Sequence, residues 1–200
     1  MQTAQAAPAS PAPAPENHAR WLPLLGLMAV ITFVTLGGFL FSGSGAETTF
    51  APEAVEVGNP VPVAGGVTIH LAAGWEQSSS SEDPVGILLS NGTGWLLAGV
   101  PAGTGTAEEL LEFYVRNYFE PHSSQLSVGS VEAFPTEAGD GVAASYVGVF
   151  DGVAVPIEGQ VIAFVGPSGT GVVLDGWAAQ GSYGSVRDQV ETMATTVVIP

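Results

Sequence analysis

A long run of uncharged, mostly apolar residues interrupts the first part of the chain. The run spans residues 21–41, WLPLLGLMAVITFVTLGGFLF. As a helix at ~1.5 Å per residue it would reach about 30 Å, the thickness of the hydrocarbon core of a bilayer. The preceding residues, 1–20, are rich in Ala and Pro, so we expect a disordered tail there. We therefore predict a tail followed by one transmembrane helix at residues 21–41.

The charges at the two ends of this run predict its orientation. Arg20 precedes the run, whereas the first charged residue after it is Glu47. Because positive residues are retained on the cytoplasmic side, the tail is predicted to be cytoplasmic and the rest extracytoplasmic, as in a single-pass signal-anchor protein of the cell membrane. The alternative is a secretory signal cleaved after Ala46, although the run is longer than the ~7–15 apolar residues of such signals.

Patterns typical of short strands fill most of the chain beyond the membrane run. Residues 42–63 are rich in Gly, Ser and Pro and are predicted to form a stalk, which leaves residues 64–200 for one folded domain. Within that domain, β-branched or alternating runs separated by turn residues predict strands at 67–71, 85–90, 95–100, 127–134, 141–150, 153–165 and 170–178.

Two amphipathic helices interrupt these strands. The first is predicted over residues 106–119, where Thr106 and Glu109 have the spacing of a capping box. The second is predicted to open at Ser185, with Asp188 in the matching position. Hairpin-linked strands interrupted by two helices indicate an α+β fold, in which an antiparallel sheet carries two main helices in an α-β-α sandwich.

Composition excludes several classes of function. The chain has no Cys, so disulfides, thiol catalysis and thiolate metal sites are excluded. Its formal net charge is −16, from 19 acidic residues against 3 basic residues, all of them Arg. Such a surface repels phosphate backbones, so no nucleic-acid partner is expected. We interpret the charge as an aid to solubility, the alternative being attraction to a basic partner.

Several segments resemble functional motifs but lack the residues that perform the chemistry. Residues 166–171, GPSGTG, have no following Lys and Ser/Thr, so we expect a hairpin connection and no bound nucleotide. The three histidines do not have the spacing of metal ligands, and no G-x-S-x-G occurs. The Asp-Gly pairs at 140–141, 151–152 and 175–176 are predicted to form tight turns rather than Ca²⁺ loops. We therefore expect no catalytic residue, cofactor or metal.

Aromatic side chains are the remaining candidates for a binding surface. Most of them are expected in the core, as is usual for a domain of this size. Tyr183 stands between glycines and is expected to be exposed. Together with Trp177 and Trp95 it forms our candidate ligand or partner surface.

The start of the folded domain resembles that of a known family. Val67–Trp75 forms an apolar strand that leads into Gly74-Trp75, similar to the opening of PsbP/LpqN-type domains, which are α-β-α sandwiches common outside bacterial membranes. Those domains usually have Pro-x-Gly-Trp, and here Ala72 takes the first position. The order of hairpins, middle helix, further strands and closing helix is similar across about residues 60–200. Actinobacterial members are often lipoproteins, which this chain without Cys is not.

This resemblance implies a non-catalytic binding or assembly role in a bacterial, actinobacterial membrane protein, and it carries no shared site. We accordingly predict a membrane-anchored accessory module that contacts lipid through residues 21–41 and binds an unidentified protein of the bacterial envelope. One alternative is a small-molecule or lipid carrier with a pocket between sheet and helix. Another is a hydrolase whose site is assembled only in space.

Overall fold

The computed structural model describes residues 57–102, 105–136 and 139–200. The predicted cytoplasmic tail (1–20), transmembrane helix (21–41) and most of the stalk lie outside these residues. In the part of the chain that the structure describes, no helix is both long and apolar enough to cross a membrane.

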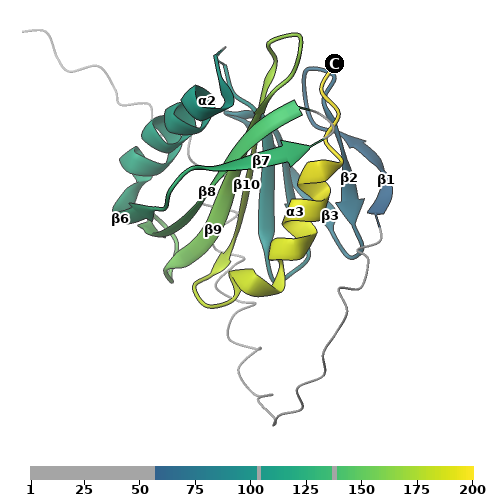
Figure 1. Cartoon of the computed structure of the whole chain (residues 1–200). Coiled ribbons are helices and arrows are strands. Elements are labelled where there is room, and N and C mark those ends of the chain that lie inside the picture. The colour runs from purple at the N-terminus through teal and green to yellow at the C-terminus, as the bar shows by residue number, and fades with distance from the viewer. Residues whose placement is uncertain (1–56, 103–104, 137–138) are drawn as a thin grey trace, which may run out of the picture. The chain divides into compact units, whose positions relative to one another are not determined.

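An eight-stranded antiparallel sheet forms the centre of the folded domain (Figure 1). The strand order is β3-β4-β5-β10-β9-β8-β6, and β7 pairs with β8 beside β6, so that β6 and β7 share one edge of the long strand β8. The strands span Glu76–Glu82 (β3), Val85–Ser90 (β4), Trp95–Val100 (β5), Ser123–Val128 (β6), Glu132–Thr136 (β7), Gly139–Phe150 (β8), Ile157–Val165 (β9) and Gly171–Ala179 (β10).

A second, two-stranded sheet lies beside the first and begins earlier than the sequence predicts. β1 (Val57–Pro62) pairs antiparallel with β2 (Thr68–Ala72), so the last part of the predicted stalk belongs to the folded domain. Val61 and Val63 pack against the hydrophobic core, which explains why this Pro-rich segment is held in place. Near the C-terminus, Val198 forms an antiparallel bridge with Thr68 and extends the small sheet.

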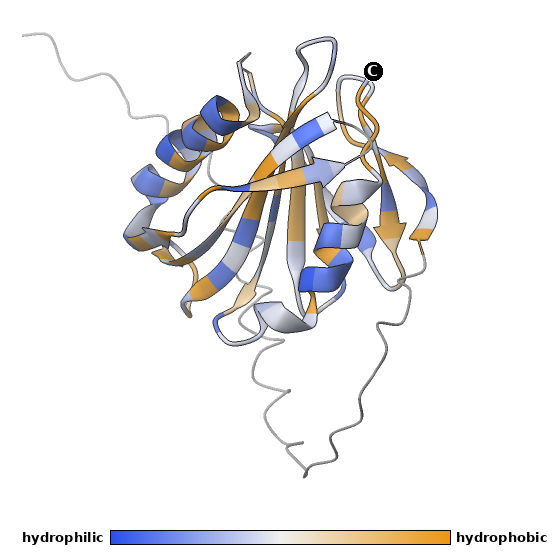
Figure 2. Cartoon of the chain, in the orientation of Figure 1, coloured by the Kyte–Doolittle hydropathy of each residue, from blue (hydrophilic) through white to orange (hydrophobic). Residues whose placement is uncertain are grey.

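One helix covers each face of the main sheet. α2 (Ala107–Tyr114) continues as a π-helical turn, Val115–Phe119, and a 3-10 turn, Glu120–His122, and it contacts β8, β9 and β10. α3 (Arg187–Thr195) follows a 3-10 turn, Tyr183–Ser185, and contacts β2 and β10. Figure 2 shows hydrophilic residues on the outward sides of both helices and hydrophobic residues along the strands. The predicted α+β class, with an antiparallel sheet and two helices packed on it, is confirmed.

Strand β10 contributes to the cores on both faces of the sheet. Successive residues of a strand point to opposite faces. Accordingly Val172 and Leu174 lie in the core under α3, together with Val190 and Met193 of that helix. Val173 lies in the other core, with the sheet-facing side chains of α2. The central strands are therefore buried on both sides, and their positions fix both helices.

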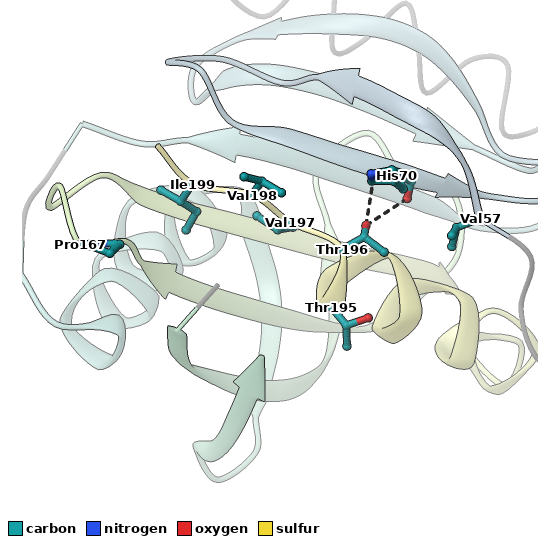
Figure 3. A pocket seen from close by; sticks show the side chains of 8 residues that line it. All are labelled: Val57, His70, Pro167, Thr195, Thr196, Val197, Val198 and Ile199. Carbon is teal, nitrogen blue, oxygen red and sulfur yellow. Dashed lines mark hydrogen bonds between the residues drawn. The ribbon is translucent and has the colours of Figure 1, made fainter. Parts of the chain in front are cut away.

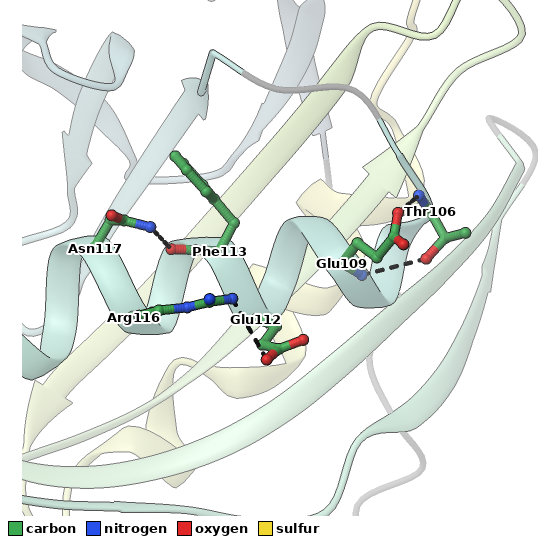
Figure 4. A network of polar contacts seen from close by, with 6 residues as sticks. All are labelled: Thr106, Glu109, Glu112, Phe113, Arg116 and Asn117. Carbon is green, nitrogen blue, oxygen red and sulfur yellow. Dashed lines mark hydrogen bonds and ion pairs between the residues drawn. The ribbon is translucent and has the colours of Figure 1, made fainter.

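The N-terminus of α2 has the capping box that the sequence predicts (Figure 4). The backbone N–H of Glu109 donates to Thr106 Oγ1 at 3.2 Å, and the backbone N–H of Thr106 donates to Glu109 Oε2 at 3.0 Å. The capping box predicted at Ser185 is wrong. α3 begins two residues later, because the Ser185 hydroxyl instead donates to the carbonyl of Ser182 within the preceding turn, at 2.7 Å.

Replacing Thr106 with Ala should destabilise the folded domain by about 1 kcal/mol, because it removes the acceptor for one helix N–H group. Urea denaturation of wild type and T106A measures the difference. The matched control is T192A on α3, whose hydroxyl only donates to the Asp188 carbonyl within the same helix. A loss in T106A no larger than that in T192A would contradict a stabilising role for the cap.

Candidate functional site

The three aromatic residues predicted to form one binding surface lie on two different faces of the sheet. Trp95 and Trp177 are direct cross-strand partners on β5 and β10, both half-buried, on the face that carries α2. Tyr183 lies in the core on the α3 face and is only 3% exposed. The expected exposure of Tyr183 is therefore wrong. Its hydroxyl lies next to Gly176, where a Cβ atom would be 3.3 Å from the hydroxyl oxygen.

An open groove of about 680 Å³ lies beside the small sheet and is a candidate binding site (Figure 3). It combines one residue from each strand of the small sheet with the β9–β10 loop, the last residue of α3 and the segment that follows it. Val57 and Val198 expose 44% and 56% of their surface there. The lining residues are Val57, His70, Pro167, Thr195, Thr196, Val197, Val198 and Ile199.

The segment after α3 is held in place by hydrogen bonds to β2. Thr68 and Val198 exchange two backbone hydrogen bonds of 3.1 and 3.0 Å. The His70 backbone N–H donates to Thr196 Oγ1 at 3.0 Å, and the Thr196 hydroxyl donates to the Met193 carbonyl at 2.7 Å. The side of the groove formed by these residues is therefore fixed before any ligand binds.

His70 supplies a polar group to the groove, which is also lined by Thr195 and Thr196. Its Nδ1 lies 2.8 Å from the Gly58 carbonyl oxygen. Since a carbonyl oxygen can only accept, Nδ1 carries the hydrogen, and in that tautomer Nε2 is an acceptor. This nitrogen can accept a hydrogen bond from a ligand. Among the described residues, no group of three His, Asp or Glu side chains is arranged to hold a metal ion.

A second polar feature lies beneath α2, at a residue that the sequence placed in a turn. Asp175 is only 5% exposed in the middle of β10. Tyr146 donates to its Oδ1 at 2.8 Å, and Tyr114 of α2 donates to its Oδ2 at 3.1 Å. Burial raises the pKa of Asp175 from 3.8 to about 7, although both hydrogen bonds favour the charged form. The carboxyl group therefore changes its charge near neutral pH.

The other Asp-Gly pairs give a mixed result. Asp151-Gly152 forms the expected turn between β8 and β9, with Gly152 at φ 77°. Asp140-Gly141, like Asp175-Gly176, lies inside a strand, so the turn prediction is wrong for both. The loop at residues 166–171 joins β9 to β10 as predicted, and the Gly166 N–H donates to the Thr170 carbonyl at 2.9 Å.

Aromatic rings enclose the Asp175 carboxyl group and separate it from the solvent. The rings of Tyr114 and Tyr118 stack at 4.8 Å between centroids, and those of Phe119 and Tyr146 lie 4.5 Å apart. The carboxyl group itself is only 5% exposed and bonds to two tyrosines. We interpret it as a proton-dependent part of the packing between α2 and the sheet.

The buried Asp175 should make the stability of the domain depend on pH. Its folded pKa lies above the unfolded value, so between about pH 4 and pH 7 the folded state holds a proton that the unfolded chain has lost. Stability should therefore fall as pH rises through this window, by an upper bound on the order of 4 kcal/mol. Urea denaturation of wild type and D175N at pH 5 and pH 8 tests this, because Asn keeps an acceptor but cannot ionise.

We expect D175N to lose most of the difference between the two pH values and to be the more stable protein at pH 8. The control is E112Q, which removes an exposed carboxylate of α2 (74% side-chain exposure) and should keep the wild-type difference. Equal pH dependence in D175N and wild type would show that Asp175 is not the titrating group.

The fold of this chain is similar to that of a protein of known structure. The chain is similar to the solution structure of cyanobacterial PsbP (CyanoP) from Synechocystis sp. PCC 6803, with a TM-score of 0.52 and 14% sequence identity, over 82% of this chain and 100% of that chain. No protein-family model matches the sequence, and neither does any curated protein. The likeness confirms the PsbP-like resemblance at the level of the fold: the folded domain of this chain has a PsbP-like fold.

Proposed function

We propose that this protein is a membrane-tethered, non-catalytic accessory module whose folded domain binds a protein partner in the bacterial envelope. The observation that carries the binding role is the open groove beside the small sheet. It exposes Val57 and Val198 by 44% and 56%, next to the fixed acceptor nitrogen of His70. Exposed apolar residues around a few polar groups are typical of a binding site.

The surroundings of the titratable groups favour binding over catalysis. His70 donates to the Gly58 carbonyl, and in the described part of the chain no hydroxyl or carboxylate side chain is hydrogen-bonded to its ring. The buried carboxyl group of Asp175 is bonded to two tyrosines and enclosed by aromatic rings. These two observations support a role in which the domain recognises a partner without transforming it.

The charges of the domain favour a partner with a basic rim. Both arginines of the described residues pair within their own helices, Arg116 with Glu112 at 3.4 Å and Arg187 with Glu191 at 4.0 Å. The remaining carboxylates give the surface its negative charge, in a chain of net charge −16. Complementary charge speeds association and selects partners, so a basic rim around an apolar centre suits this domain.

The membrane tether is the part of the proposal that rests on sequence alone. Residues 21–41 have the length and composition of a membrane-spanning helix, and Arg20 favours a cytoplasmic N-terminus. The domain would then stand outside the membrane. Sequencing the N-terminus of the mature protein separates this anchor from a cleaved signal, since a chain that starts at Glu47 would exclude the anchor.

Crosslinked affinity purification from native membranes tests the proposed partner site. Wild-type protein should retrieve one partner in stoichiometric amount, and V198D should lose at least nine-tenths of it, because the new charge lies in the apolar groove. The control is V85D on β4, since Val85 and Val198 are both 56% exposed. Equal recovery by V198D and V85D would place the partner elsewhere, and no partner for any variant would contradict the accessory role.

A small-molecule or lipid carrier is the second candidate, because the groove volume of about 680 Å³ falls within the range of ligand pockets, ~300–1,000 Å³. The groove lies between the small sheet and the C-terminal segment, rather than between the main sheet and a helix. Native mass spectrometry of the purified protein should detect a bound apolar molecule if this candidate is correct. The same molecule should then be absent from V198D and present in V85D.

A further inference from the structure

Strand β3 forms a free edge of the main sheet. It pairs with β4 on one side, and no described strand pairs with its other side. Five of its seven residues are exposed, and the other two are half-buried. An open edge offers unpaired backbone N–H and C=O groups to an extended chain that comes alongside. The position of β3 therefore allows the sheet to take up a further strand.

The turn between β4 and β5 shows which backbone groups of β3 are free. The Asn91 N–H donates to the Gly94 carbonyl across this turn at 3.3 Å. The bonding direction alternates along a strand, so the odd-numbered residues of β4 bond to β5 and the even-numbered ones bond to β3. The partners of these even-numbered residues on β3 include Ser79 and Ser81. The N–H and C=O groups of Ser80, between them, therefore point away from the sheet.

Other edge strands contain proline, which limits the addition of a strand because it has no N–H to donate. β1 contains Pro60 and Pro62, and β7 contains Pro135. β3 has neither Pro nor Lys, the residues that commonly protect an edge, and its one irregularity is the register shift between Gln77 and Ser79. β6 also lacks Pro, but it has no charged residue that would select a partner.

The charges on and around β3 select a basic partner. Glu76 and Glu82 are the first and last residues of the strand, and Asp83 follows directly. Residues 57–102, which contain β1 to β5, include no Lys or Arg. Opposite charges on directly facing residues of two strands stabilise the pair, whereas like charges destabilise it. A strand with Lys or Arg facing the two glutamates therefore fits this edge.

The same charges oppose pairing with a second copy of the chain. An antiparallel copy of β3 in full overlap is centred on Ser79, and it places Glu76 of each chain opposite Glu82 of the other. Two like-charged pairs would then face each other, in a chain whose net charge is already −16. The occupant that fits is a basic segment of a different protein.

We propose that the free edge of β3 binds an extended, basic segment of a protein partner as an additional strand. Backbone hydrogen bonds to Ser80 hold the segment, and basic residues near its ends pair with Glu76 and Glu82. None of the residues that line the groove belongs to β3, so this surface is separate from the groove. Binding here does not depend on the partner site proposed above.

A synthetic peptide, Arg-Thr-Val-Thr-Val-Thr-Arg, tests this edge on the full-length, detergent-solubilised protein. Its residues favour strands, and its sequence is the same in both directions, so it fits either strand orientation. The comparison peptide has Glu in place of both Arg. Fluorescence anisotropy of the labelled peptides should show at least tenfold tighter binding of the basic peptide.

Exchanging the charges of the edge should reverse this preference, so E76R/E82R should bind the acidic peptide more tightly. The control is E120R/E132R, which changes the net charge by the same amount at exposed glutamates outside β3 and should keep the wild-type preference. Equal affinity of the wild type for both peptides, or an unchanged preference in E76R/E82R, would contradict the proposal.

Two variants of Ser80 separate backbone pairing from attraction between charges. S80P removes the outward N–H, whereas S80A keeps it. An edge strand tolerates Pro where the N–H faces solvent, and melting curves of both variants confirm that they fold. We expect S80P to weaken binding of the basic peptide at least fivefold and S80A to leave it unchanged. Equal binding by the two variants would reject strand addition, and if S80P fails to fold, E76R/E82R still decides.

The peptide assay uses neither the groove nor the native partner, so its failure can be distinguished from a failure of the proposed function. V198D should bind the basic peptide as tightly as wild type. Weaker binding in V198D would assign the peptide to the groove and contradict a site on β3. Loss of the copurifying partner in V198D together with no peptide binding by wild type would keep the groove and reject the edge.

Discussion

The structure depends on the burial of β9 and β10 from both sides. Their alternate residues pack into the core under α2 on one face and into the core under α3 on the other, and β10 contacts both helices. Close contacts with glycine make this arrangement possible. A Cβ atom on Gly159 would lie 2.9 Å from the Tyr146 ring, and one on Gly176 would lie 2.8 Å from Val190. The small sheet and its groove then form along the side of this double core.

The sequence predicts those parts of the fold whose pattern is local. β4 and β5 are predicted with their observed bounds, because Asn91 and Gly92 mark the turn between two apolar runs. β3 is missed, since its residues, EQSSSSE, are polar and become a strand only by pairing with the buried β4. Asp175 is misread for the opposite reason: the Asp-Gly pair is typical of a turn, yet the apolar residues before and after it belong to one buried strand. A single Asp between two apolar stretches of one strand is the feature of the sequence that indicates a buried carboxylate.

The groove could not be predicted from the sequence, because its residues come from four separate segments. Position 57, position 70, position 167 and residues 195–199 meet only after β2 has paired with the C-terminal segment. None of the segments carries a pattern that differs from an ordinary strand or loop. The burial of Tyr183 could not be predicted either. Its neighbouring glycines suggest exposure, whereas its hydroxyl lies next to Gly176 of the distant strand β10 and its side chain is buried.

If the domain is tethered at its N-terminal side, as we propose, the hairpin of β1 and β2 has a mechanical consequence. Val57 pairs with Ala72 at the open end of the hairpin, and Pro62 pairs with Thr68 near its turn. Tension applied through Val57 would therefore break the hydrogen bonds between β1 and β2 one after another, starting at the open end. Separating β1 in this way needs less force than breaking all of these bonds at once. The double core would remain folded while one wall of the groove is removed. In such a tethered protein, a pull on the chain would alter the groove before it unfolds the rest of the domain.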